Sequence, residues 1–528
     1  MIAACAHRCG CAGGEQTGEG VTGIEEIADI GDDVETFRRL QSRLPELFER
    51  VFPDRLHPRT VLIVPSLSLD QEVLSKISGV HHYEERMLCM LQLLRMPRTH
   101  IIYVSSQPIA ECIIDYYLHL MPGVPQHHAR ERLTLLSCHD DADVPLTQKI
   151  LDRPRLRDRI RSALGDLSLA HMACFNVTPL ERRLATQLGI PIYGCDPALQ
   201  AFGSKSGSRK LFRESGLPIA DGFEHLADDN DIAEAIAELK GRNPDLRRAV
   251  IKLNEGFSGE GNAIFRFDEA PSAEVTKKWV ADRLADVTFC AGDMSWELYE
   301  SKIGEMGCIV EAYIEGAHKR SPSVQYRIDP SGRLSPVSTH DQILGGGGDQ
   351  VFLGCRFPAD EDYRLEIQNS GLRTARLLKE KGALGHFGID FVSVREGDAW
   401  RHYAIEINLR KGGTTHPFIM LRFLTDGAYD SDTGLFSTPG GETRYYYATD
   451  NLESAHYRGL TPQDLIDIAV RHNIHFHGPA QRGVVFHLIG ALSQYGKLGM
   501  VCVDKSHEDA SHLYHETIAI LDREGGKR

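Results

Sequence analysis

The sequence has no apolar run of the roughly 18 residues that a membrane-spanning helix needs. It also lacks an excess of positive charge, because 74 Asp and Glu outnumber 59 Lys and Arg and give a formal net charge of −15. Phosphate backbones favour basic patches, so nucleic acid is not an expected partner. The first apolar residues stop at His7 and Arg8, too early for a signal peptide. We therefore expect a cytoplasmic protein whose partners include neither a membrane nor a nucleic acid.

Cysteine is sparse, with twelve in 528 residues, and most stand in apolar stretches such as 87–90 and 501–503. This setting favours reduced thiols in a core over a disulfide framework. Residues 1–30, which include Cys9 and Cys11, contain no periodic apolar pattern and are expected to form a disordered tail. The spacing of the tail's thiols matches no closed tetrahedral metal site, so its role stays open.

The chain is long enough for several domains, at 528 residues of which 42% are hydrophobic. Within residues 31–202, short apolar runs alternate with helical segments, which predicts an α/β domain around a parallel sheet. Residues 203–416 form a second region, where strands and glycine-rich turns replace this alternation. Residues 417–528 form a C-terminal α+β domain with a strand-rich stretch and a final helix.

Three polar side chains interrupt two apolar strands that are joined by a turn at 396–399. Asp390 lies on the first strand, and Glu406 and Asn408 lie two residues apart on one face of the second. A simple hairpin places Asp390 opposite Glu406. Oxygen ligands on one face of a β-ribbon suit Mg²⁺ held together with substrate phosphates. A solvated hairpin face is the alternative, but apolar residues such as Ile407 should bury the other face.

A lysine stands inside the apolar strand expected at 249–253, directly before a glycine-rich turn. Lys252 needs an anion there, and Gly256, Gly259 and Gly261 let the backbone fold over a phosphate and offer it N–H groups. The glycine spacing alone is equally consistent with an ordinary hairpin. The embedded lysine favours the phosphate-binding interpretation.

Two further segments add to this pattern. Lys205 opens a basic helical segment that ends near Gly216. The strand expected from residue 308 ends in four residues that suit a linker reading a purine edge through its backbone and a carboxylate. These four residues are Glu311, Ala312, Tyr313 and Ile314.

In this order, the lysines, the glycine loop, the linker strand and the acidic ribbon resemble the ATP-grasp superfamily. The resemblance implies that Lys205 and Lys252 contact ATP phosphates and that the linker recognises adenine. It also implies that Asp390, Glu406 and Asn408 hold two Mg²⁺ ions, for which Mn²⁺ can substitute. The implied fold is the α/β ATP-grasp architecture, with an N-terminal parallel-sheet domain, a central ATP-grasp region and a C-terminal α+β domain.

A closer resemblance covers most of the chain. Segments 406–417 and 483–488 are similar to the pheganomycin-type peptide ligases, which implies a C-terminal domain of the peptide-ligase type. One position departs from the common pattern, in which an acid just beyond the linker holds the ribose. This chain offers Glu315 there, with His318 as the competitor. The oligomeric state is not readable, and a homodimer is compatible with the sequence.

An ATP-grasp ligase transfers a phosphoryl group from ATP to a carboxylate and lets an amine displace the phosphate. Arg410 and Lys411 follow the acidic ribbon as a pair of candidate catalytic residues. We expect the planar fork of Arg410 to steady the acyl phosphate and the tetrahedral oxyanion. A solvated basic pair at a strand end is the alternative. The glycine turn at 345–348 is flexible enough for a lid, and a long hairpin fits it equally well.

Three functions compete on this pattern. The first is an amide-forming ligase with carboxylate and amine substrates, which the resemblance places among amino acids or peptides in natural-product biosynthesis. The second is an ATP-grasp kinase that phosphorylates a hydroxyl group. The third is a non-catalytic nucleotide-binding module, against which the intact set of Asp390, Glu406 and Asn408 speaks. We expect the first, although no motif names the carboxylate or the amine.

Overall fold

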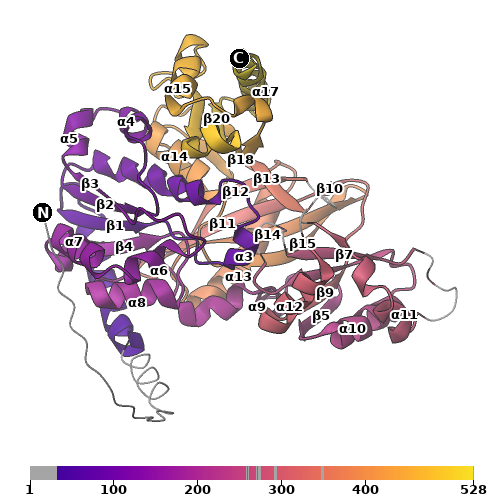
Figure 1. Cartoon of the computed structure of the whole chain (residues 1–528). Helices are drawn as coiled ribbons and strands as arrows, with labels where there is room; N and C mark the ends of the chain where they lie inside the picture. The colour runs from indigo at the N-terminus through magenta and orange to yellow at the C-terminus, as the bar shows by residue number, and fades with distance from the viewer. Residues whose placement is uncertain are drawn as a thin grey trace, which may run out of the picture.

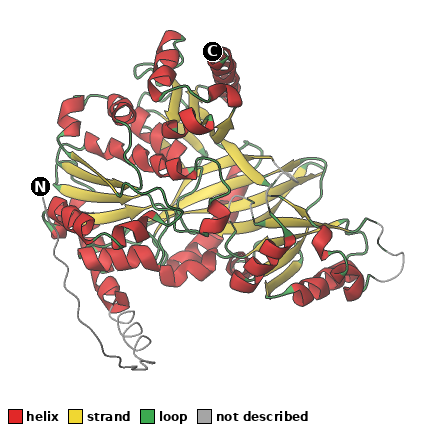
Figure 2. Cartoon of the chain, in the orientation of Figure 1, coloured by secondary structure: helices red, strands yellow, loops and turns green. Residues whose placement is uncertain are grey.

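The computed structural model describes residues 33–526, apart from 257–258, 260, 269, 271–274, 291–293 and 346–349. The tail predicted at 1–30 and most of the glycine turn at 345–348 lie outside the described residues. Three larger sheets follow one another along the chain: a parallel sheet, a small antiparallel sheet, and a large sheet that runs through the centre of the molecule (Figures 1 and 2).

The N-terminal sheet is parallel, as predicted, with the strand order β3-β2-β1-β4. Val61 and Ile63 of β1 pack into one core with η1 and α4, whereas Leu62 and Val64 pack into another with α6, α7 and α8. Helices therefore cover both faces, which is why these strands read as continuous apolar runs.

The strands of this part are β1 (Arg59–Val64), β2 (Thr99–Ser105), β3 (Leu133–Ser137) and β4 (Ala170–Cys174). Its helices are an unlabelled helix at 33–41, α2 (Leu44–Val51), α3 (Gln71–Leu74), the 3₁₀ helix η1 (Val80–Arg95), α4 (Glu111–His119), α5 (Gln126–Arg130), α6 (Leu146–Leu151), α7 (Pro154–Leu164), η2 (Leu167–Leu169), α8 (Pro179–Leu188) and η3 (Pro197–Gly203).

The second sheet is antiparallel, in the order β5-β9-β6-β7-β8. It is packed on α10, because Ile232 and Ile236 share a buried cluster with Ile251 of β6. Its strands are β5 (Gly222–Leu226), β6 (Arg248–Leu253), β7 (Asn262–Arg266), β8 (Thr288–Phe289) and β9 (Cys308–Ala312). The helices around it are α9 (Lys205–Glu214), α10 (Asp229–Arg242), α11 (Lys277–Ala281), η4 (Leu284–Asp286) and α12 (Trp296–Met306).

The large sheet has the order β10-β14-β11-β12-β13-β18-β20-β19, and β15 pairs with β14. Gly354 of β13 pairs with Thr449 of β18, so the sheet continues across the boundary predicted at 416–417. The division into domains at 202–203 and 416–417 stays a prediction.

The strands of this sheet are β10 (Lys319–Arg320), β11 (Pro322–Ile328), β12 (Leu334–Gly345), β13 (Val351–Phe357), β14 (Gly385–Glu396), β15 (Ala399–Asn408), β18 (Tyr445–Glu453), β19 (Gly483–His487) and β20 (Lys497–Asp504). A two-stranded sheet is formed by β16 (Ala428–Asp430) and β17 (Leu435–Ser437). The helices are α13 (Arg364–Glu380), α14 (Thr415–Thr425), η5 (Ala455–Tyr457), α15 (Pro462–Arg471), η6 (Ile489–Ala491), α16 (Leu492–Tyr495) and α17 (His507–Gly525).

One hydrophobic core joins the two ends of the chain. Ile63 of β1 and Leu88 of η1 belong to the same buried cluster as Leu421 of α14 and Val501 of β20. Burial of apolar surface contributes roughly 25 cal/mol per Å², so a cluster of this extent holds η1 firmly against the C-terminal strands. Side chains from both ends of the chain can therefore contribute to one site.

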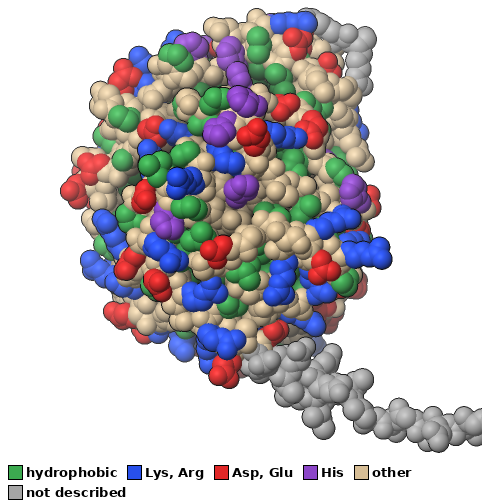
Figure 3. Space-filling view, turned by 90° about the vertical axis from the view of Figure 1, so that its left-hand side faces the viewer, with side chains coloured by type: hydrophobic (Ala, Val, Ile, Leu, Met, Phe, Trp, Pro, Cys, Tyr) green, Lys and Arg blue, Asp and Glu red, His purple; other side chains and the backbone are tan. Residues whose placement is uncertain are grey.

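One face of the surface carries charges of both signs. On the face drawn in Figure 3, Lys and Arg side chains are interspersed with Asp and Glu, so the negative net charge is not concentrated there. Among the helices of the described ranges, none combines the length and the apolarity that crossing a membrane requires.

Candidate active site

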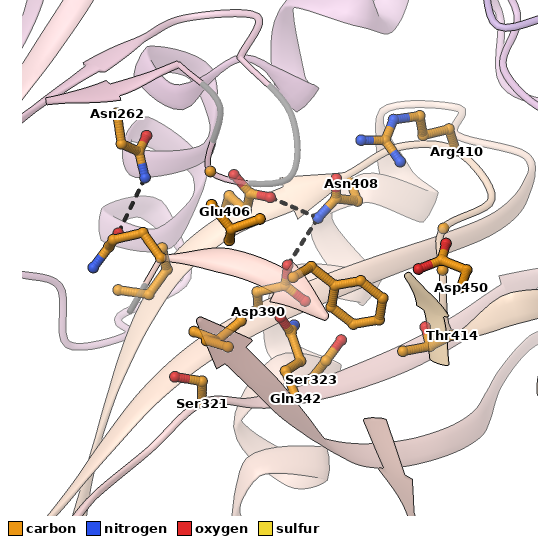
Figure 4. A pocket seen from close by; sticks show the side chains of 18 of the residues that line it. Asn262, Ser321, Ser323, Gln342, Asp390, Glu406, Asn408, Arg410, Thr414 and Asp450 are labelled. Atoms are coloured by element: carbon orange, nitrogen blue, oxygen red, sulfur yellow. Dashed lines mark hydrogen bonds between the residues drawn. The ribbon is translucent and has the colours of Figure 1, made fainter. Parts of the chain in front are cut away.

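The acidic ribbon folds with the predicted register. β14 and β15 pair antiparallel with Asp390 opposite Glu406 and Gly388 opposite Asn408, and a bulge follows Asp390. The amide nitrogen of Asn408 donates hydrogen bonds of 2.9 Å to Asp390 Oδ2 and to Glu406 Oε1. The three polar side chains predicted to act together therefore meet on one face of the ribbon (Figure 4).

A lysine from α9 reaches the same ribbon. Lys205 Nζ donates to Glu406 Oε2 and, at 3.0 Å, to the carbonyl oxygen of Gly256. Burial alone would raise the pKa of Glu406, but the charge and hydrogen bond of Lys205 and the hydrogen bond of Asn408 lower it to about 2. Glu406 is consequently ionised at any physiological pH.

The second carboxyl group has the opposite shift. Burial, and then the negative charge of Glu406, raise the pKa of Asp390 to about 6, although Ser323 and Gln342 donate hydrogen bonds that lower it. Two neighbouring acids whose pKa values are driven apart are typical of a functional site, because a fold gains nothing from holding them together.

Asp390→Asn is expected to raise the melting temperature of the metal-free protein by roughly 1–3 °C at about pH 8 and to change it little at about pH 4.5. The folded-state pKa of Asp390 is about 6, above the ordinary 3.8. Ionisation of Asp390 therefore destabilises the folded protein. This loss of stability increases as the pH rises from about 4 to 6 and is fully present above pH 6. Thermal denaturation in chelator at both pH values measures this, and an equal shift at both would rule out the proposed ionisation.

The donor set fits a hard divalent cation. Mg²⁺ is usually held by one or two carboxylates together with substrate phosphates, and Asp390, Glu406 and Asn408 supply two carboxylates and one amide. The described ranges contain no cluster of three or more His, Cys, Asp or Glu side chains that could hold a metal, and the ribbon has two such residues beside Asn408. The ribbon thus supplies only part of the octahedral ligand shell of Mg²⁺, which phosphate oxygens and water would complete.

Lys252 has an anion beside it, but that anion belongs to the protein. Its Nζ lies 2.6 Å from Glu311 Oε2, and the other oxygen of Glu311 accepts a hydrogen bond from Arg209 of α9. Glu311 is only 2% exposed, and although burial opposes ionisation, the two cations lower its pKa. Lys252 also lines the central cavity. It therefore contacts Glu311 and is also accessible to a ligand in the cavity.

The linker strand forms as β9, yet its side chains do not enter the cavity. Glu311 is used by Lys252 and Arg209, which corrects the expectation that its carboxylate reads a purine edge. The Ala312 amide donates to Asp221 O at 2.8 Å. Neither Tyr313 nor Ile314 is among the lining residues. Any recognition by this segment must therefore use its backbone.

The two residues weighed for a ribose contact also lie off the cavity lining. Glu315 is held by Arg248, at 2.9 and 2.5 Å, and this pairing lowers the pKa of Glu315. Arg248 in turn lies 3.7 Å from the centre of the Tyr313 ring. His318 is exposed and accepts a backbone hydrogen bond from Arg395 at its carbonyl oxygen. The choice between Glu315 and His318 stays a prediction.

The glycines after β6 lie so close to other backbone atoms that a side chain would not fit. Gly259 has φ +81° and lines the cavity, and a Cβ there would lie 2.2 Å from the carbonyl oxygen of Gln350. Gly256 and Gly261 face each other, so that a Cβ on Gly261 would lie 3.0 Å from the Cα of Gly256. Asn262 then donates to Gln350 Oε1 at 3.1 Å. Gly259 and Asn262 thus lie close to Gln350, directly before β13, and Figure 4 draws the hydrogen bond of Asn262.

A cavity of about 260 Å³ connects these groups with all three parts of the chain. Its lining includes polar residues that sequence reasoning missed, namely Arg86, Lys319, Gln342 and Asp450. A signal existed for Arg86, because residues 84–86 are three charged residues directly before an apolar run, and all three are buried. Asp450 carries no comparable signal.

Arg410 lies at the end of β15 and lines the cavity. Its Nη1 donates to the carbonyl of Lys411 at 3.1 Å, and its guanidinium forms no ion pair with a carboxylate of the described residues. Burial lowers the pKa of Arg410, while Glu406 raises it. A partly buried guanidinium without a carboxylate partner is available to an anionic ligand.

Lys411 points the other way. Its Nζ donates to the carbonyl oxygen of Cys174, at the end of β4, at 2.5 Å. It lines a small separate pocket with Met87 and Cys89, outside the central cavity. The position of this ammonium group does not support the catalytic role predicted for Lys411, because successive residues leaving a strand face opposite sides. Lys411 instead ties the ribbon to the N-terminal sheet.

The two segments that carry the closer family resemblance touch each other. His416 at the start of α14 and His487 at the end of β19 are joined through their Nε2 atoms at 2.9 Å. Burial lowers the pKa of both imidazoles, that of His487 to about 3, so one neutral ring donates and the other accepts. This contact fixes the loop after the acidic ribbon against the C-terminal strands.

This arrangement resembles that of the ATP-grasp proteins, as predicted. The family described as "IQCH-like, ATP-grasp" matches residues 197–287 and 278–432. The family described as "PGM1 C-terminal domain" matches residues 464–517.

Individual relatives make the assignment more particular. The chain is 28% identical over 478 residues to the L-propargylglycine–L-glutamate ligase of Streptantibioticus cattleyicolor, covering 88% of this chain and 94% of that protein. It is 25% identical over 236 residues to the D-alanine–D-alanine ligase of Laribacter hongkongensis, covering 44% of this chain and 64% of that one. The resemblance to peptide ligases is thereby confirmed.

A solved structure supports the fold. The biotin carboxylase domain of the Hydrogenobacter thermophilus 2-oxoglutarate carboxylase, a dimer in complex with MgADP, ADP and bicarbonate, aligns with a TM-score of 0.53. The alignment covers 87% of this chain and 89% of that one at 13% sequence identity. The α/β ATP-grasp fold predicted from the sequence is confirmed.

Proposed function

We propose that the protein is an ATP-dependent carboxylate–amine ligase that forms an amide through an acyl phosphate and releases ADP and phosphate. The observation that carries this proposal is the set of Asp390, Glu406 and Asn408, joined to Lys205 and facing the same cavity as Lys252 and Arg410. Two relatives that are named as amino-acid ligases support it.

Asp390, Glu406 and Asn408 would hold the divalent metal, for which we propose two Mg²⁺ ions with Mn²⁺ as a substitute. When bound, Mg²⁺ supplies positive charge that neutralises the phosphate oxygens of ATP. Lys205 and Lys252, which line the cavity from α9 and β6, bind the phosphates as point charges. The backbone amide of Gly259, which also lines the cavity, would add an N–H donor.

The first step transfers the γ-phosphoryl group to the substrate carboxylate. A carboxylate oxygen forms the new bond to phosphorus, the bond to the bridging oxygen of ADP breaks, and no protein nucleophile is needed. In the second step the amine attacks the acyl carbon, the amide bond forms and phosphate leaves. Arg410 is placed to hold the acyl phosphate and the tetrahedral oxyanion with its planar guanidinium.

Water must be kept from the acyl phosphate. Leu67, Leu74, Phe175 and Phe352 line the cavity on the sides that face the N-terminal part and β13. These apolar walls reduce the water available to hydrolyse the intermediate. The predicted lid at 345–348 falls largely outside the described residues and stays a prediction.

The remaining assignments follow the same proposal. We propose amino-acid or peptide substrates, in line with the name of the Streptantibioticus relative, and a place in natural-product biosynthesis. A cytoplasmic site of action suits an enzyme that needs ATP, and nine described cysteines are free thiols, eight of them buried. A homodimer is proposed because a structural relative is described as a dimer.

Hydroxylamine trapping tests the reaction class. The protein is incubated with ATP, Mg²⁺ and the twenty standard amino acids, with hydroxylamine as the nucleophile. An acyl phosphate gives a hydroxamate and ADP, whereas the alternative kinase gives a stable phosphate ester and a non-catalytic nucleotide-binding module gives neither. A mass-spectrometric screen of amino-acid pairs then identifies products lighter than the summed substrates by one water.

Lys252→Ala is expected to weaken ATP binding by about tenfold or more, because a charge-assisted contact with phosphate is lost. Titration calorimetry with ATP and Mg²⁺ measures the effect. Lys149→Met is the matched control, since Lys149 is also buried but bonds to Ser106 and Asp140 outside the central cavity. Unchanged ATP affinity in Lys252→Ala, or an equal loss in both variants, contradicts the phosphate contact.

A further inference from the structure

The cavity has a second charged end. Arg86 of η1 and Asp450 of β18 both line it, although they come from the N-terminal and C-terminal parts of the chain. Their side chains are only 9% and 8% exposed, and Arg86 Nη1 lies 3.2 Å from Asp450 Oδ2. In Figure 4, Asp450 and Arg410 lie to one side of the acidic ribbon and Asn262 lies to the other. A nucleotide on the side of the glycine loop therefore leaves this end for another substrate.

This ion pair leaves binding capacity on both partners. The Arg86 guanidinium lies over the rings of Tyr83 and Phe175, 4.4 and 4.7 Å from their centres. Its Nε donates to the Tyr83 carbonyl at 3.4 Å, and Nη2 has no hydrogen-bond partner in the described part of the chain. Burial raises the pKa of Asp450 even though Arg86 and Lys497 lower it. The single contact at 3.2 Å thus falls short of the bidentate geometry that arginine and carboxylate prefer.

On the basis of the ligase activity proposed above, we propose that Arg86 and Asp450 bind the acceptor substrate, which is an α-amino acid with a free carboxylate. Arg86 binds the α-carboxylate of the acceptor, and Asp450 binds its amino group. The zwitterion exchanges one protein ion pair for two charge-assisted contacts, so no charge is left unpaired in this buried end.

The direction of binding assigns the acceptor role. The donor carboxylate must reach the γ-phosphoryl group of ATP beside the acidic ribbon, so it cannot be the group that Arg86 holds. The acceptor carboxylate is not consumed in the reaction and can stay on Arg86. Arg410 lies on the same side of the ribbon as Asp450 and lines the same cavity, where it can hold the acyl phosphate.

Asp450 also provides a place for the acceptor's proton. The ammonium gives one proton to the Asp450 carboxylate, and the freed electron pair forms the C–N bond to the acyl carbon. The C–O bond to phosphate breaks, and the second N–H proton leaves with the phosphate as hydrogenphosphate. The product is a neutral amide whose free carboxylate remains on Arg86.

The test compares two nucleophiles in each variant. Hydroxylamine needs no amino-acid site, so hydroxamate formation reports on carboxylate activation alone, whereas amide formation with a free amino acid reports on the acceptor site. In Arg86→Gln and Asp450→Asn, the ratio of amide to hydroxamate is expected to fall at least about 30-fold, through a raised KM for the acceptor. Arg86→Gln should also lose the preference of the wild type for the free acid over its α-carboxamide.

Asp426→Asn is the control for a second ion pair that involves η1. The Arg95–Asp426 ion pair, at 2.5 Å, also joins η1 to the chain beyond α14, but neither residue lines the cavity. Its amide-to-hydroxamate ratio should equal that of the wild type. If Arg86→Gln and Asp450→Asn instead lose both products in parallel with their melting temperatures, the pair is only structural and the inference is overturned.

The outcomes separate this inference from the proposed function. Hydroxamate formation by the wild type without amide formation from any of the twenty free amino acids overturns the acceptor site and leaves the ligase chemistry standing. Absence of both hydroxamate and ADP release overturns the proposed function itself.

Discussion

Replacing Glu406 by Gln is expected to lower the rate of ligation by at least about 10²-fold while the fold stays intact. Gln keeps the volume of the side chain and its hydrogen bond from Asn408, but it removes one of two anionic ligands from the metal site. Lys205, now without its carboxylate, also loses the partner that holds it beside the ribbon. ADP release in the presence of substrates measures the rate, and far-ultraviolet circular dichroism checks the fold.

Glu224→Gln is the control for Glu406→Gln. Glu224 is a carboxylate of similar burial, 15% against 18% exposed, and it is paired with Arg209 and Arg213 away from the cavity. Its loss should change the rate only a few-fold. Unchanged turnover in Glu406→Gln, or an equal loss in both variants, would remove the metal assignment from the ribbon.

Arg410→Gln is expected to lower the rate of ligation by about 10²- to 10³-fold, with little change in ATP affinity. The guanidinium is partly buried, lines the cavity and has no carboxylate partner among the described residues, so its charge is available to a ligand. Loss of one preorganised donor to a developing oxyanion typically costs about this much. Arg410→Lys should recover only part of the rate, because an ammonium group lacks the planar fork.

The neighbouring Lys411 gives the sharpest comparison. Because its Nζ is bonded to the Cys174 carbonyl outside the cavity, Lys411→Met should lower the melting temperature and reduce the rate less than about tenfold. Single-turnover kinetics on both variants measure the chemical step. A larger rate loss in Lys411→Met than in Arg410→Gln would restore Lys411 as the catalytic cation and count against Arg410.

The local geometry of the ribbon was predictable because it depends on short-range rules. Apolar alternation and the turn at 396–399 are enough to place Asp390 opposite Glu406, and the register has this pairing. The parallel N-terminal sheet was predictable for a similar reason, since strands that are buried on both faces read as continuous apolar runs. Both patterns depend on residues that are close together in the sequence.

The partners of buried charges were harder to predict. The sequence indicates that Lys252 needs an anion, but not that Glu311, from a strand 59 residues later, supplies it. The same limit explains why Glu311 was assigned to a purine edge. Pairing of buried ions depends on which strands become neighbours, and the order β5-β9-β6 is a property of the folded sheet.

By itself, the sequence indicated the resemblance to ATP-grasp ligases, the α/β architecture and the pairing of Asp390 with Glu406, because these depend on patterns among nearby residues. Only the tertiary structure decided which charges share the cavity, turned Lys411 away from it, and brought Arg86 to Asp450 across 364 positions of sequence. The physical reason is that a common hydrophobic core holds both ends of the chain together. The hydrophobic effect is non-directional, so a local sequence pattern does not indicate which segments pack against each other.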